Sequence, residues 1–147
     1  MFLGAEITRL VNGISINQER YIENMMREYN VSRVPLREAP IFTIEDVFVT
    51  EQDEELAEEP YCRVIGRAQY CANASRPDVL FYANLLARFA SRPRRKHKEC
   101  LKLILRYLCR TSDYSLPCKQ GQLTRKHTFL VLANQNAIPA LIFIRPN

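Results

Sequence analysis

Apolar residues recur at two different spacings along the chain, one typical of strands and one of helices. Near the N-terminus, Leu3, Ala5 and Ile7 alternate with glycine and glutamate, and Asn12-Gly13 precedes a second run, ISINQ. This alternation predicts a strand, and Asn-Gly between two such runs predicts a two-residue hairpin turn. Residues 18–29 instead have helical spacing after the N-cap candidate Asn17, with one apolar stripe: Tyr21, Ile22, Met25, Met26 and Tyr29.

Residues 61–110 have the pattern of three consecutive helices, separated by Ser75-Arg76-Pro77 and Ser91-Arg92-Pro93. The helix predicted for 61–74 has a core stripe of Tyr61, Val64, Ile65, Ala68, Cys71 and Ala72. The helix at 78–90 is apolar nearly all round, as expected of a buried central helix. The helix at 94–110 buries one stripe, which is Cys100, Leu101, Ile104, Leu105 and Leu108. His97 begins that stripe, and we interpret it as a packed or hydrogen-bonded structural residue and not as a ligand.

The remaining segments have weaker signals. FTIEDVFVT, residues 42–50, is compatible with a strand, and the acidic run that follows has little to bury. We therefore predict a mostly α-helical chain with a short N-terminal β-hairpin. Its parts are a hairpin and helix in residues 1–40, an acidic, disordered linker in 41–60, a three-helix bundle in 61–117 and an unassigned, irregular tail in 118–147, which we expect to pack poorly.

Charge is segregated along the chain, whose net charge is +5. Residues 45–59 hold eight acidic residues and no basic ones, whereas residues 88–110 hold nine basic residues and one acidic residue, Glu99. The basic block, which includes Arg95, Lys98 and Lys102, favours a polyanion partner, although a solvated helix face has the same composition.

Cysteine spacing and hydropathy exclude some classes of protein. The five cysteines lie far apart, form no CxxC pair and are odd in number, so we expect reduced thiols in an intracellular protein and no bound metal. The most apolar stretch, Thr128–Ile144, is interrupted by Asn134, Gln135, Asn136 and Pro139, so we expect no membrane segment. Nothing in the sequence predicts a cofactor or a small-molecule substrate.

The helix at 61–74 also has a second stripe, outside its core face. Cys62, Gly66, Gln69 and Asn73 fall on one side, with Tyr70 beside them and Arg63 and Arg67 flanking them. A glycine inside a helix costs about 1 kcal/mol relative to alanine, so its presence needs a reason. Two are available at this stage: tight packing against another helix, or close approach of a nucleic-acid duplex with the arginines near phosphates.

Three blocks of the sequence resemble the Pol polyprotein of copia-type LTR retrotransposons. Phe2–Ile7 with Ile14–Tyr21 is similar to that family's FLGIEI…ISLSQ-KYI segment, and Tyr61–Gly66 with Arg76-Pro77-Asp78 is similar to its YR-x-x-VG…TRPD block. Phe89–Leu116 resembles its RF-x-S-x-P…H…LRYL-x-x-T-x-x-Y-x-L run. The likeness extends over about residues 2–117, and three blocks in this order are a specific signal.

The resemblance implies a place within reverse transcriptase. Residues 2–16 would be the primer grip, including Phe2, Leu3 and Gly4, and residues 61–110 the helical thumb, whose first helix follows the minor groove of the template-primer. In that helix a glycine and an aromatic residue lie against the duplex, and Gly66 and Tyr70 match them. Together with the second stripe and the basic block, this gives the residues expected to bind nucleic acid weakly and non-specifically: Gly66, Arg67, Gln69, Tyr70, Asn73, Arg95, Lys98 and Lys102.

Departures from the family pattern shape the expected function. The family's catalytic aspartates lie in a Tyr-x-Asp-Asp motif upstream of these blocks, and no Asp-Asp pair occurs here. Lys98 stands where the family usually has tryptophan, and Cys109-Arg110 where it has Lys-Gly. The RNase H start is missing after residue 118, where the tail resembles out-of-frame sequence. We expect a truncated, non-enzymatic Pol fragment, pseudogene-like and without activity; the alternatives are a host-retained nucleic-acid-binding module and a helical protein-interaction domain.

Overall fold

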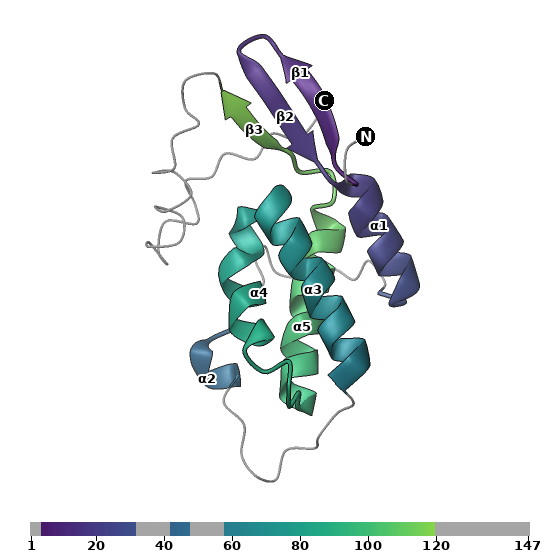
Figure 1. Cartoon of the computed structure of the whole chain (residues 1–147), viewed down its shortest axis with the longest axis vertical. Helices are drawn as coiled ribbons and strands as arrows, with labels where there is room; N and C mark the ends of the chain where they lie inside the picture. The colour runs from purple at the N-terminus through teal and green to yellow at the C-terminus, as the bar shows by residue number, and fades with distance from the viewer. Residues whose placement is uncertain (1–3, 32–41, 48–57, 120–147) are drawn as a thin grey trace.

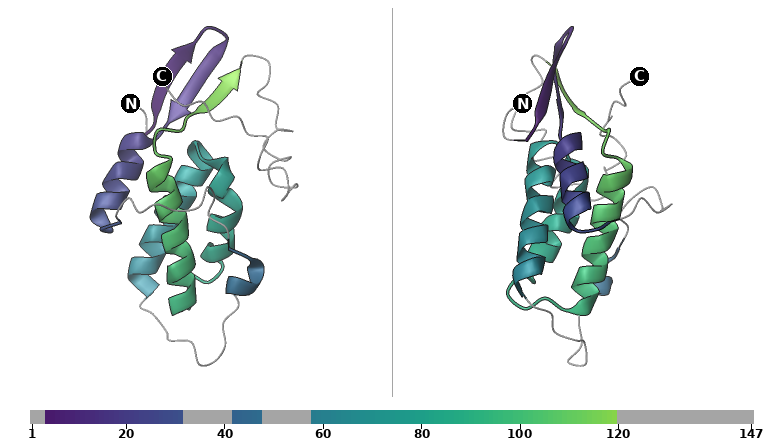
Figure 2. Two further views of the ribbon diagram at one scale, coloured as in Figure 1. Left: turned by 180° about the vertical axis from the view of Figure 1, so that it is seen from behind. Right: turned by 90° about the vertical axis from the view of Figure 1, so that its right-hand side faces the viewer.

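A small antiparallel sheet stands at one end of a helical bundle in the computed structural model, which describes residues 4–31, 42–47 and 58–119 (Figures 1 and 2). Along the described chain, the hairpin and helix α1 come first, then the short helix α2, and then the bundle helices α3, α4 and α5, before the chain returns to the sheet. The predicted fold class, mostly α-helical with an N-terminal β-hairpin, is confirmed.

The sheet contains one strand more than the sequence predicted. β1 (Glu6–Leu10) pairs antiparallel with β2 (Gly13–Asn17), and β2 pairs antiparallel with β3 (Leu116–Lys119). Leu10 is the partner of Gly13, so the two turn residues are Val11 and Asn12, one position earlier than Asn-Gly predicted. Cys118 lies opposite Ile14, so the first two residues of the stretch predicted as an unassigned tail, 118 and 119, belong to the sheet.

Helix α1 (Glu19–Glu28) follows the hairpin at once. The N-cap of this helix is Gln18, one residue later than the predicted Asn17. Asn17 instead precedes the cap, and its side-chain Oδ1 accepts a hydrogen bond from the backbone N–H of Glu19 at 2.6 Å. Ile22, Met25 and Met26 are buried, and the helix packs on α5.

The bundle consists of α3 (Glu58–Ala74), the 3-10 turn η1 (Pro77–Val79) with α4 (Leu80–Ala87), and α5 (Arg95–Arg110). All six core residues predicted for α3 and all five predicted for α5 are buried. The helix expected at 78–90 is shorter, because its first turn is 3-10 and the chain leaves the α-helix after Ala87 in successive i→i+3 hydrogen bonds. It is also less enclosed than expected, since Phe81 is partly exposed.

Helix α2 (Ile44–Val47) replaces the strand that FTIEDVFVT suggested. Phe42 and Val47 are buried, and the imidazole of His97 holds the end of this turn. Its Nδ1 accepts from the backbone N–H of Arg94 at 3.0 Å, so Nε2 carries the proton and donates to the carbonyl oxygen of Val47 at 3.0 Å. The structural role predicted for His97 is confirmed. The rest of the acidic run up to residue 57, and the tail from residue 120, lie outside the described residues.

Candidate nucleic-acid interface

One side of α3 is open to solvent and bordered by α4. Cys62, Gly66 and Asn73 are exposed and Gln69 is half-buried. The Cys62 thiol donates to the carbonyl oxygen of Ala90 at 3.3 Å, and Gln69 Nε2 donates to Asn84 Oδ1 at 3.0 Å. We call Cys62, Gly66, Gln69 and Asn73 the α3 face; the structure brings these four residues together as the sequence predicted.

Gly66 lies at the centre of this face and has no neighbour that requires a glycine. A Cβ atom built on its backbone meets no atom of the described residues within 4 Å. Tight packing against another helix of the bundle is therefore wrong as the explanation of Gly66. The approach of a duplex, the other explanation, stays a prediction.

Arg67 and Tyr70 turn away from the open face and contact α1. The Arg67 guanidinium lies 5.2 Å from the ring centroid of Tyr21 and 5.7 Å from that of Tyr29, and it forms an ion pair with Glu28. Although burial lowers the pKa of Arg67, hydrogen bonds with Tyr21, Glu28 and Tyr29 raise it on balance. The Tyr70 ring packs on Tyr21 with centroids 5.1 Å apart. Helix α1 thus engages two of the predicted binding residues.

Of the primer-grip-like residues, Phe2 and Leu3 lie outside the described residues, and Gly4 packs against α1. Gly4 has a φ of 78°, a left-handed conformation that favours glycine. A Cβ atom there would lie 3.1 Å from Tyr21 Cδ2. Gly4 therefore allows the start of the hairpin to approach α1 closely.

The basic residues of α5 lie on the other side of the bundle from the α3 face. Arg95 and Lys98 are exposed, and Lys102 Nζ donates to Glu99 Oε1 at 2.7 Å. Helices α3 and α5 both bury their apolar stripes in one core, so their exposed stripes point away from each other. Figure 1 shows α3 in front of α5, and the view from behind in Figure 2 shows α5 in front. The residues predicted to bind nucleic acid therefore lie on two sides of the bundle.

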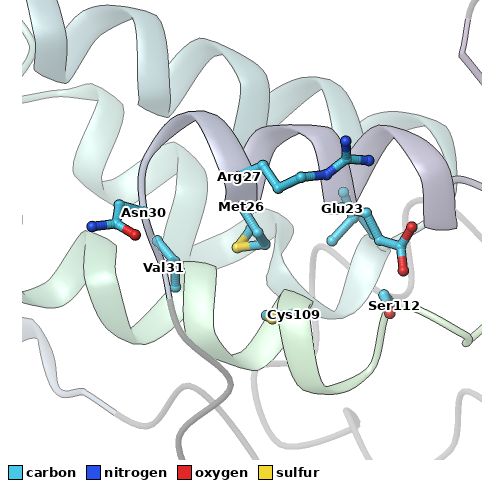
Figure 3. Close-up of a pocket in the computed structure, with 8 residues that line it drawn as sticks. Glu23, Met26, Arg27, Asn30, Val31, Cys109 and Ser112 are labelled. Carbon is cyan, nitrogen blue, oxygen red and sulfur yellow. The ribbon is translucent and has the colours of Figure 1, made fainter.

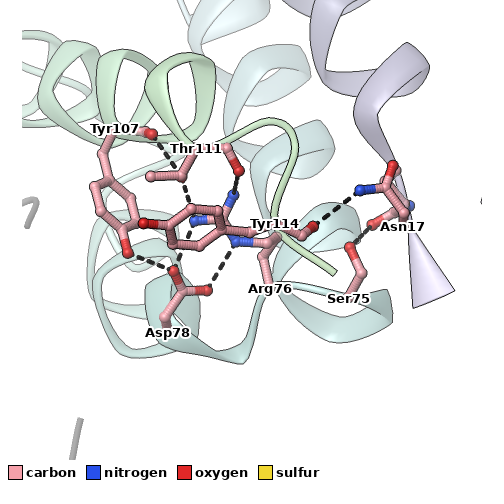
Figure 4. A network of polar contacts seen from close by, with 8 residues as sticks. Asn17, Ser75, Arg76, Asp78, Tyr107, Thr111 and Tyr114 are labelled. Atoms are coloured by element: carbon pink, nitrogen blue, oxygen red, sulfur yellow. Dashed lines mark hydrogen bonds and ion pairs between the residues drawn. The ribbon is translucent and has the colours of Figure 1, made fainter. Parts of the chain in front are cut away.

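Arg76 and Asp78, noted in the sequence only as part of a family block and a helix start, form a buried ion pair (Figure 4). The guanidinium of Arg76 donates to both carboxylate oxygens of Asp78, at 3.1 and 2.7 Å, and to the carbonyl oxygen of Thr111 at 2.8 Å. The Tyr107 hydroxyl donates to Asp78 at 2.7 Å. Burial, and then the Asp78 carboxylate, raise the pKa of Tyr107.

This network joins the start of α4 to the end of α5, and neighbouring contacts extend it to the hairpin. Asn17 Nδ2 donates to the carbonyl oxygen of Tyr114 at 3.0 Å, and Ser75 Oγ donates to Gln18 Oε1 at 2.7 Å. The network therefore fixes the sheet on the bundle. Charged residues are rarely buried, and the sequence analysis gave no sign of this buried pair.

Two cavities lie near α1, and neither contains the α3 face. One, about 410 Å³, lies between α3, α5 and the residues that follow α1, Tyr29 and Val31; its lining is mostly apolar and includes Lys98 and Lys102. The other, about 400 Å³, lies between α1 and the end of α5, where Figure 3 shows Met26 and Cys109 with Glu23 and Arg27 of α1. Glu23 and Arg27, the charged residues that line this second cavity, both belong to α1 and lie one turn apart.

Within the part of the chain that the structure describes, no group of three or more His, Cys, Asp or Glu residues is placed to hold a metal ion. No helix in the same ranges is long and apolar enough to cross a bilayer. The five cysteines are all unpaired thiols.

Comparison with known proteins finds relatives among transposon proteins. A transposon Ty5-1 protein of Saccharomyces cerevisiae is 31% identical over 121 residues, which are 82% of this chain and 39% of that protein. The retrovirus-related Pol polyprotein from transposon RE1 of Arabidopsis thaliana is 28% identical over 128 residues, 87% of this chain and 9% of the polyprotein. The homologues of this chain are Pol polyproteins of Ty5/copia-type retrotransposons. A further Pol polyprotein, from transposon TNT 1-94 of Nicotiana tabacum, is 27% identical over 63% of the chain.

The retrotransposon relationship confirms the family resemblance but covers only part of each relative. The chain spans about two fifths of the Ty5-1 protein and about a tenth of the RE1 polyprotein. No family model matches the chain. No solved structure matches it either.

Proposed function

We propose that this stretch of a retrotransposon Pol protein is the primer-grip and thumb portion of a reverse transcriptase. It binds template-primer duplexes weakly and without sequence preference at the α3 face. By itself it has neither polymerase nor RNase H activity. The observation that carries the proposal is Gly66, exposed at the centre of α3 with nothing in the described structure that requires a glycine.

The shape of the α3 face suits the groove of a duplex. Gly66 is eight residues from each end of α3, Glu58 and Ala74. The helix backbone is therefore not covered by a side chain at its middle. Gln69 and Asn73 lie on the same side, and amide side chains donate and accept hydrogen bonds with groove edges and sugars. A glycine flanked by uncharged amides favours close contact between the helix backbone and a duplex. It does not attract phosphates by charge.

Arginines around the α3 face supply the attraction for phosphates. Arg63 is exposed on α3 itself. Arg88 and Arg92 are exposed and lie two residues on either side of Ala90, whose carbonyl accepts from Cys62 at the edge of the face. Contacts to phosphates carry no sequence information, so binding through these arginines is non-specific.

The expected lack of activity follows from the residues that nucleotide transfer requires. Both polymerisation and RNase H cleavage use metal ions held by closely placed carboxylates. The sequence contains no adjacent aspartates, and the eight acidic residues of 45–59 are divided between α2, the start of α3 and the segment that joins them. We therefore expect no primer extension by the purified chain in magnesium or manganese; extension that persists after removal of contaminating polymerase would contradict this.

Fluorescence anisotropy with a labelled duplex and a labelled single strand tests the α3 face. We expect dissociation constants on the order of 10⁻⁴–10⁻⁶ M that rise steeply with salt. Gly66→Leu should weaken duplex binding several-fold and single-strand binding less, because only the duplex presents a groove to the helix. Asn24→Leu, at an exposed position of α1, is the matched control and should leave both unchanged. Equal losses on both ligands, or none, would contradict the groove interpretation.

A further inference from the structure

We propose that α5 binds a second, separate nucleic-acid segment through its own basic surface, so that one copy of the chain bridges two segments. We call Arg95, Lys98, Lys102 and Arg106 the α5 face. The inference rests on the proposed function for the α3 face, and it adds a partner of the same chemical class on the opposite side of the molecule.

The separation of the two faces excludes a shared duplex. Cys62 and Gln69, on the α3 face, contact Ala90 and Asn84, at the α4 side of α3. Lys98 and Lys102 instead line a cavity with Tyr61, whose ring is on the buried side of α3. A straight duplex lying on the α3 face therefore has the bundle core between itself and the α5 face (Figure 2).

The α5 face has the length and the spacing to follow a phosphate backbone. Its residues recur at three- or four-residue intervals, so they lie along one stripe. At about 1.5 Å per residue, Arg95 and Arg106 are about 16 Å apart along the axis, which corresponds to about five nucleotides of one strand.

Little within the described structure offsets the positive charge of this stripe. The first turn of α5 contains no acidic residue, although the positive end of the helix dipole favours anions there. Glu99 is the one acidic residue of 88–110, and it accepts from Lys102. The hydrogen bond from Lys102, and the charges of Lys102, Arg95 and Arg106, lower the pKa of Glu99. Basic side chains at a positive helix end repel one another, and a polyanion relieves that repulsion.

A bead-capture assay tests the bridge. A biotinylated duplex is immobilised, the full chain is added at about 50 mM salt, and a second, fluorescent duplex is then captured. Arg95→Glu/Lys98→Glu is compared with Arg20→Glu/Arg27→Glu, whose exposed arginines both lie on α1; each double variant lowers the net charge by four, two per reversal. Circular dichroism confirms that both variants fold, and sedimentation establishes whether the protein is a monomer.

We expect the wild type and the Arg20/Arg27 variant to capture the second duplex. The Arg95/Lys98 variant should stay on the beads but capture at least tenfold less. For binding of a single duplex, the slope of log K against log salt should differ by no more than about one between this variant and wild type. If both faces formed one shared surface, the variant would lose two phosphate contacts and the slope would fall by about two.

Three outcomes would overturn the bridge, and they differ in what they say about the α3 face. Full capture by the Arg95/Lys98 variant overturns the bridge alone. If the Arg95/Lys98 variant is lost from the beads while Gly66→Leu behaves as wild type, α5 binds both the immobilised and the fluorescent duplex. That outcome overturns the α3 proposal as well. Capture that depends on self-association of the chain places the second site on another copy and overturns the single-copy bridge.

Discussion

Two glycines of this chain should respond to the same substitution with opposite signs. Gly66 lies inside α3, has no positive φ and has open space where a Cβ would be. Gly66→Ala removes the entropic cost of a helix-interior glycine and should stabilise the fold by about 0.5–1 kcal/mol. For a chain of this size that corresponds to a rise in Tm of about 1–4 °C.

Gly4→Ala is the matched contrast. Its φ of 78° disfavours any residue with a Cβ, and the added carbon would lie 3.1 Å from Tyr21. We expect a loss of stability of about 1–2 kcal/mol, from the left-handed conformation and from the displacement of the tyrosine ring.

Thermal and urea unfolding followed by circular dichroism measure both changes, and duplex anisotropy is recorded on the same samples. We expect Gly66→Ala to raise stability without tightening duplex binding. A Gly66→Ala protein that is less stable than wild type would refute it, because the glycine would then have an internal structural role.

Three further predictions concern buried groups. Asp78→Asn should cost about 3–5 kcal/mol of urea stability, because Arg76 stays buried without its ion pair; Asp46→Asn, at an exposed position, should cost less than about 1 kcal/mol, and equal costs would contradict the network's role. At pH 8 the exposed thiol of Cys62 should react quickly with Ellman's reagent and that of buried Cys71 only after unfolding; because Cys118 is half-buried, a fast phase that persists in Cys62→Ala/Cys118→Ala would refute this. Burial raises the pKa of Cys71 to about 12, so its thiol stays neutral when folded but ionises from about pH 8.5 when unfolded. Its contribution to stability is therefore full below about pH 8.5 and falls as the pH rises toward 12, by up to about 1.4 kcal/mol per pH unit, and Cys71→Ala should flatten that decline; an unchanged slope in urea midpoints between pH 7.5 and 10.5 would contradict the assignment.

Long periodic segments were predictable because their pattern is local. Helices α3 and α5 have 17 and 16 residues, and both formed where their apolar stripes indicated. Helix α2 and strand β3 have four residues each, too few for a period to decide. Contacts distant in sequence determine both: His97 holds the carbonyl of Val47, and Cys118 lies opposite Ile14.

The candidate site was predictable to the extent that it depends on one helix. Helical spacing placed Gly66 and Asn73 on one open side. The same spacing gave no sign that α1 would engage Arg67, because the contacts with Tyr21 and Tyr29 come from a distant part of the sequence. Nor does a charge count show which side of a bundle each helix exposes, so the sequence did not show that the α3 and α5 residues would lie on different sides.

The central claim, that the α3 face contacts duplexes, is tested most directly by two-dimensional ¹⁵N–¹H NMR of the full chain titrated with an RNA–DNA duplex at low salt. We predict that the largest amide shift changes below saturation fall on residues 62–73, including Gly66, with a second set on the first turns of α5 as the duplex reaches excess. Shift changes confined to α5 or to the hairpin, with the Gly66 amide unmoved, would contradict the account.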